Sequence, residues 1–159
     1  MKNHAPTRRA VILGAAVTVG STLLHSQIAQ AASSEINTSY FGNLAVDGYD
    51  VVAYFSKGAP TEGSSSFTVD YKGATWRFAS AENRAKFQSN PEKYAPKYGG
   101  YCAWAASQGY VADADPEAWD IHDGALYLNY NKSIRERWRQ DKPGNIAKAD
   151  AIWPGPLSN

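Results

Sequence analysis

One cysteine and one histidine in the second half of the chain are the clearest candidates for metal binding or catalysis. Cys102 lies in the stretch Gly-Tyr-Cys-Ala-Trp, and His122 directly precedes an Asp-Gly pair. A thiolate and an imidazole are ligands of copper and zinc, and they also form the nucleophile and base of thiol enzymes. Two such residues do not complete a zinc or blue-copper site, so a metal would need carboxylates or a second copy of the chain. A buried structural cysteine and an exposed structural histidine are the alternatives.

A glycine-flanked aromatic segment around this cysteine is the best candidate for a ligand-binding surface. It covers residues 98–104, with the sequence Tyr-Gly-Gly-Tyr-Cys-Ala-Trp. Glycines allow unusual backbone conformations and close approach, and aromatic rings give the flat apolar walls that are common in ligand pockets. The alternative is that the rings fill the core and the glycines make room for them. The predicted ligand-binding residues are Tyr98, Gly99, Gly100, Tyr101 and Trp104, with Tyr49, Asp50, Tyr54 and Trp76 as neighbours from upstream.

The composition of the chain and the absence of known catalytic motifs argue against several classes of function. The 159 residues carry 16 basic and 15 acidic side chains, without a basic patch or tail that would indicate nucleic-acid binding. A single cysteine excludes an intramolecular disulfide. The sequence has no phosphate loop, no nucleophile elbow and no zinc-protease motif, so no catalytic residue is assigned.

The first 31 residues have the composition of an export signal. Arg8 and Arg9 precede an apolar run, and the run is followed by Ala-Gln-Ala at residues 29–31, a typical cleavage site. The paired arginines predict the twin-arginine export machinery as a partner, with cleavage after Ala31 and a periplasmic location. An ordinary secretory signal with two arginines is the alternative. The apolar run is short for a stable membrane span, and residues 32–159 have the length of a single domain.

Local patterns predict the elements that must position these residues. Alternating apolar residues predict strands on both sides of Lys72-Gly73, and Ser80 is a suitable N-cap for a helix over residues 81–89. Asp123-Gly124 predicts a second hairpin, and Asn131 the start of a helix. Further elements are a strand over residues 51–55, one or two helical turns over 102–107 and a last helix from Lys142-Pro143. The predicted class is α+β, a small antiparallel sheet with short helices packed mainly on one side.

Residues 67–94 and their flanks resemble the YHS domain, a small metal-associated module. The family pattern is an aromatic strand, a glycine turn, a second aromatic strand, Phe-x-Ser and a short helix with a following Phe. The matching residues are Tyr71, Gly73, Trp76, Phe78, Ser80, Phe87, Pro91 and Tyr94. Residues 48–55, 98–104 and 126–131 are similar to an exported branch of that family, so the resemblance covers roughly residues 40–155.

The resemblance implies a scaffold in which one expected metal site is missing. In metal-associated relatives, cysteines flank the Phe-x-Ser region, and the matching positions here are Ala79 and Asn83. Neither side chain replaces a thiolate ligand of a soft metal. The chain is therefore predicted to be an exported, non-enzymatic module that binds a small ligand or acts as an accessory protein. The alternatives are copper or zinc handling through Cys102 and His122, and a small thiol enzyme with Cys102 as nucleophile.

Overall fold

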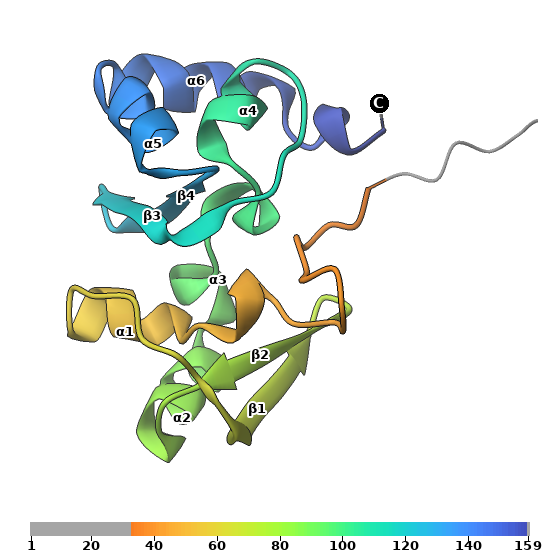
Figure 1. Cartoon of the computed structure of the whole chain (residues 1–159), viewed down its shortest axis with the longest axis vertical. Helices are drawn as coiled ribbons and strands as arrows, with labels where there is room; N and C mark the ends of the chain where they lie inside the picture. Colours follow the sequence, from red (N-terminus) through yellow and green to blue (C-terminus); the bar gives the residue numbers. More distant parts are fainter. Residues whose placement is uncertain (1–32, 159) are drawn as a thin grey trace, which may run out of the picture.

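The fold contains two small hydrophobic cores, which lie on opposite faces of the second β-hairpin, residues 115–129. The computed structural model describes residues 33–158, which form an N-terminal lobe (residues 46–94) and a C-terminal lobe (residues 101–158) connected by residues 95–100 (Figure 1). The predicted export signal lies outside the described residues. Among residues 33–158, no helix combines the length and the apolar character that a membrane span requires.

A hairpin and three short helices build the N-terminal lobe. In chain order the elements are η1 (Val46–Gly48), α1 (Val51–Ser56), β1 (Ser64–Tyr71), β2 (Ala74–Phe78), α2 (Ala81–Ser89) and α3 (Pro91–Tyr94). Lys72 and Gly73 both have positive φ, 51° and 75°, as the two-residue turn between β1 and β2 requires. The Ser80 hydroxyl accepts a hydrogen bond from the amide of Asn83 and begins α2.

The C-terminal lobe repeats the combination of hairpin and helices. Its elements are η2 (Lys97–Gly100) at the connection, α4 (Ala103–Ser107), β3 (Asp115–His122), β4 (Ala125–Asn129), α5 (Lys132–Arg139), α6 (Lys142–Ile152) and η3 (Gly155–Ser158). Asp123 and Gly124 form the hairpin turn, again with positive φ. Asn131 and Asp141 cap α5 and α6 with their side chains, so each helix has a defined start.

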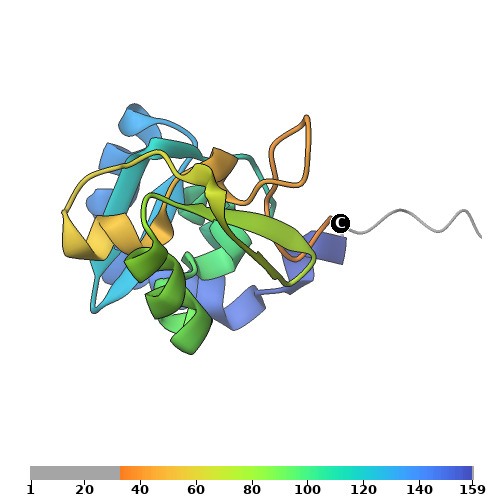
Figure 2. The same cartoon turned by 90° about the horizontal axis from the view of Figure 1, so that it is seen from below.

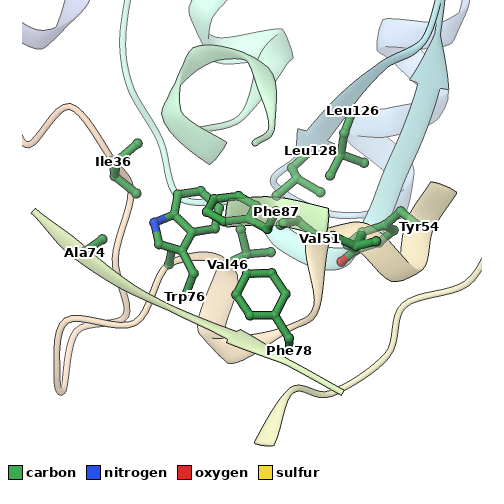
Figure 3. Close-up of a cluster of buried hydrophobic side chains, with 12 residues drawn as sticks. Ile36, Val46, Val51, Tyr54, Ala74, Trp76, Phe78, Phe87, Leu126 and Leu128 are labelled. Carbon is green, nitrogen blue, oxygen red and sulfur yellow. The ribbon is translucent and has the colours of Figure 1, made fainter. Parts of the chain in front are cut away.

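Strand β4 is buried on both faces and joins the two cores. Leu126 and Leu128 pack into the first core beside Val51 and Phe87 (Figure 3). Tyr127 points to the opposite face, because successive side chains of a strand alternate, and its ring lies 5.1 Å from that of Trp138 in the second core. The hairpin is therefore common to both lobes.

An N-terminal arm, residues 33–45, contacts both lobes and places Ile36 and Ala45 in the first core. The amide of Asn37 donates to the Gly99 carbonyl at 2.9 Å, and the amide of Ala45 donates to Thr75 of β2 at 3.0 Å. At its start, the amide of Ser33 donates to the Leu157 carbonyl at 2.7 Å, so the arm begins beside the last turn of the chain (Figure 2).

The structure confirms the α+β class and corrects two details. The strands form two separate two-stranded antiparallel sheets instead of one sheet, since the hairpins meet through side chains and not through strand pairing. The predicted strand over residues 51–55 is wrong, because this segment is α1. The Asp50 carboxylate accepts hydrogen bonds from Val52 and Ala53 and so caps a helix. A short continuous apolar run does not by itself distinguish helix from strand.

Candidate ligand-binding site

The two tyrosines of the predicted binding segment are turned into the fold. Tyr98 and Tyr101 are only 4% and 8% exposed, whereas Trp104 is half-buried. The Tyr98 hydroxyl donates to Asp150 Oδ1 at 3.0 Å, and the Tyr101 hydroxyl donates to the Ser34 carbonyl at 2.9 Å. Burial raises the pKa of Tyr98, and its hydrogen bond to Asp150 raises the pKa further. Both phenols are thus neutral donors inside the protein at physiological pH.

The two glycines of the segment make room for other parts of the chain. Gly99 and Gly100 have positive φ, 63° and 84°. A Cβ added to Gly99 would lie 1.9 Å from the carbonyl oxygen of Glu35, and one on Gly100 would lie 3.3 Å from the Pro96 ring. The space beside Gly99 is therefore taken by the arm.

The upstream neighbours lie in or beside the first core. The Tyr54 hydroxyl donates to the Pro116 carbonyl at 2.9 Å, and the Trp76 indole donates to the Tyr71 carbonyl at 3.0 Å. Tyr49 is half-buried and packs against the same core. The polar atoms of Tyr54 and Trp76 are thus used within the fold.

Asp50 is a fully buried carboxylate with four hydrogen-bond donors. Oδ1 accepts from the amides of Val52 and Ala53, at 2.9 and 3.2 Å. Oδ2 accepts from the amide of Ala79 at 2.8 Å and from Asn83 Nδ2 at 2.7 Å. Ala79 and Asn83 are the positions at which the resemblance places cysteines. In this chain both positions bind a carboxylate that fastens α1 to the start of α2.

Cys102 and His122 are not brought together. Cys102 is buried, pairs with Leu128 through an isolated bridge, and has its Sγ 3.8 Å from Asn129 Oδ1. His122 pairs with Ala125 at the other end of β4. Three residue steps along a strand span about 10 Å. Within residues 33–158, no group of three or more His, Cys, Asp or Glu side chains is arranged to hold a metal ion.

A hollow between the two lobes is the best-placed site next to the predicted segment. Its volume is about 350 Å³, and we call it the inter-lobe pocket. The arm, the β1–β2 turn, α3, η2 and the end of α6 enclose it. Its lining residues are Glu35, Ile36, Tyr71, Lys72, Glu92, Ala95, Pro96, Lys97, Tyr98, Gly99, Asp150 and Trp153.

The inter-lobe pocket combines flat aromatic walls with charges of both signs. The ring of Trp153 lies 5.5 Å from that of Tyr98. Lys72 forms a salt bridge with Glu35 at 2.5 Å, whereas Lys97 makes none with the described part of the chain. Such a lining offers apolar contact and both donors and acceptors, as small-ligand pockets do.

The sequence did not indicate most of these residues. Tyr98 and Gly99 were predicted, but Lys72, Asp150 and Trp153 were not assigned to a site. Asp150 is near the end of the predicted last helix, and Trp153 follows three residues later. Whether these two residues line the same pocket as Lys72 depends on how the lobes pack, and local sequence patterns do not predict this packing.

Comparison with known proteins identifies one region of the chain. No curated protein and no solved structure matches the chain significantly. Residues 52–98 match the family profile described as the YHS domain. The matched region runs from α1 to η2 and includes the β1–β2 hairpin, Ala79, Asn83 and Tyr98. The chain therefore contains a YHS domain, which forms most of its N-terminal lobe.

Proposed function

We propose that the chain is an exported, non-enzymatic accessory module that binds a small polar ligand in the inter-lobe pocket. One observation carries this proposal: the YHS domain does not enclose the pocket alone. Tyr71, Lys72 and Tyr98 come from the matched region, whereas Asp150 comes from α6 and Trp153 directly follows that helix. Pockets at the junction of two structural units are frequent ligand sites.

The charges of the pocket indicate the type of ligand. Two lysines, Lys72 and Lys97, face three carboxylates, Glu35, Glu92 and Asp150. A lining with both signs suits a small zwitterionic or strongly hydrogen-bonding molecule with one flat apolar face. It does not suit a polyanion, which would meet the carboxylates as well as the lysines.

Native mass spectrometry of the exported protein tests ligand binding. We expect a bound small molecule on protein purified from the periplasm, and its loss in Trp153→Ala, which removes one aromatic wall. Lys132→Gln, an exposed change on α5 outside the pocket, is the matched control and should keep the adduct. Bare polypeptide in the wild-type sample, or an adduct that Trp153→Ala retains, would contradict the proposal.

The export route needs its own experiment. We expect the double variant Arg8→Lys, Arg9→Lys to accumulate uncleaved in the cytoplasm, whereas the natural sequence yields a periplasmic protein that begins at Ala32. Normal export of the double variant would point to the ordinary secretory route. Metal handling and thiol catalysis stay predictions from the sequence, since the separate positions of Cys102 and His122 support neither within one chain.

A further inference from the structure

A second hollow lies on the C-terminal lobe and shares no residue with the inter-lobe pocket. Its volume is about 300 Å³. We call it the Trp104 groove, and the residues that matter for its chemistry are Trp104, Tyr110, Tyr130, Ile134 and Arg137, with Cys102 also in the lining. These residues come from α4, from the segments after α4 and β4, and from α5.

The walls of this groove are aromatic rings that remain in contact with water. Tyr110 and Tyr130 are 50% and 56% exposed, and Trp104 is half-buried. A single exposed ring is common on a protein surface, but here three aromatic side chains line one hollow. Surfaces of this kind mark binding sites.

Among the residues that the structure describes, Arg137 is the only charged one in the lining of the groove. Its guanidinium lies over the Trp104 ring, 5.6 Å from the centroid. The neighbouring arginines of α5 are paired, Arg135 with Glu136 and Arg139 with both Glu136 and Asp120. Within residues 33–158, Arg137 forms no salt bridge. A cation without a carboxylate partner is thus held at the edge of an aromatic hollow.

We infer that the Trp104 groove binds a flat aromatic carboxylate. The ring of the ligand stacks against Trp104 and the two tyrosines, and its carboxylate pairs with Arg137, whose planar fork donates a hydrogen bond to each of the two carboxylate oxygens. The volume is at the lower end of the range for ligand sites, which fits one or two fused rings. This site is independent of the proposed function, because none of its residues lines the inter-lobe pocket.

Titration of ¹⁵N-labelled protein with three probes, followed by NMR, tests the inference. The probes are 2-naphthoate, the uncharged 2-naphthylmethanol and the non-planar cyclohexanecarboxylate. We expect 2-naphthoate to shift the Trp104 indole signal and the amides of residues 104–112 and 130–137. We expect each of the other two probes to bind at least about tenfold more weakly, since each lacks one of the two recognised features, a difference of about 1.4 kcal/mol.

Variants of two residues of α5, one inside and one outside the groove, distinguish specific from unspecific binding of 2-naphthoate. Arg137→Gln should weaken 2-naphthoate at least about tenfold, and Arg137→Lys should give an intermediate loss because it keeps the charge without the fork. Lys132→Gln should leave the affinity unchanged, since this exposed residue lies outside the groove. Both changed side chains are exposed on α5, so the spectra should otherwise remain those of the folded protein.

Four results would overturn the inference. They are no binding of 2-naphthoate at about millimolar concentration, equal affinity in Arg137→Gln, equal affinity for the non-planar acid, and shifts confined to the inter-lobe pocket.

Discussion

The hydroxyl of Tyr98 lies 3.0 Å from Asp150 Oδ1 and donates a hydrogen bond that connects η2 to α6. Both residues line the inter-lobe pocket, so this bond fixes the wall of the pocket that the connecting segment and the C-terminal lobe build. The ring of Tyr98 also packs between Tyr127 and Trp153. The same residue thus contributes to the second core and to the candidate site.

Tyr98→Phe isolates the contribution of that hydrogen bond. The ring contacts remain and the exposed Asp150 regains water, so we expect the free energy of unfolding to fall by about 0.5–1.5 kcal/mol. Tyr98→Ala also removes the ring and should cost about 3–5 kcal/mol. Urea unfolding of both variants measures the difference. Equal losses would show that the ring packing contributes little.

Local signals predicted the elements of the fold, and tertiary contacts decided the rest. The turns at Lys72-Gly73 and Asp123-Gly124 were predicted because positive φ at two adjacent residues demands such pairs. The helix α1 was missed because its run of apolar residues is continuous and shows neither helical nor strand spacing. The only local sign of a helix was Asp50, which can act as an N-cap.

The candidate site was predictable only in part. The sequence marked Tyr98 and Gly99, and it placed Cys102 and His122 among the reactive residues. The Asp123-Gly124 turn fixes His122 at the start of β4, but the sequence did not show that Cys102 pairs with Leu128 near the other end of the strand. Nor did it show that Glu35 from the arm fills the space beside Gly99.

Asp50→Asn should be strongly destabilising although it changes a single atom. If the amide oxygen keeps the place of Oδ1, the new NH₂ group faces two donors, the amide of Ala79 and Nδ2 of Asn83. We expect a loss of about 2–4 kcal/mol, because two hydrogen bonds to a buried charge are replaced by opposed donors. The exposed Asp70→Asn is the control and should change stability by less than about 0.5 kcal/mol. Guanidinium unfolding compares them, and similar losses would contradict the assigned role of Asp50.

Gly99→Ala should detach the arm more than it unfolds the lobes. The new methyl group would meet the Glu35 carbonyl at 1.9 Å, whereas a Cβ on Gly73 meets nothing within 4 Å. Both glycines have positive φ, so Gly73→Ala reproduces the backbone strain, about 1 kcal/mol, without the clash.

Hydrogen exchange at the Asn37 amide is the direct readout for the arm, since this amide donates to the Gly99 carbonyl. We expect its exchange to accelerate at least about tenfold in Gly99→Ala and to change little in Gly73→Ala. Equal protection in the two variants would mean that the arm adjusts without leaving its position.

Asp120 should make the free energy of unfolding fall as the solution is made acidic. Burial acts to raise the pKa of this carboxyl, but hydrogen bonds from Lys142 and Arg139 outweigh burial and hold the pKa below its usual value. A depressed pKa stabilises the fold above the unfolded-state value of about 4, and this contribution is lost as the pH falls through the folded-state pKa.

Asp120→Asn removes that contribution. We expect a loss of about 1–3 kcal/mol near neutral pH, limited because both cations are partly exposed. The difference from the natural protein should shrink below about pH 4. Urea unfolding at a series of pH values checks this, and a difference that stays constant down to about pH 2 would contradict the ionic role.

The hydrogen bond from Ser33 to Leu157 sets an order of events during synthesis. A ribosome makes residue 33 long before residue 157, so the start of the arm has no partner until the last helical turn has left the exit tunnel. Its contacts with Thr75 and Gly99 become available earlier, which means that the arm closes stepwise from its C-terminal end. If the chain is exported as proposed, a transport system that carries folded chains would receive the arm closed, whereas one that threads unfolded chains would leave this closure to the far side of the membrane.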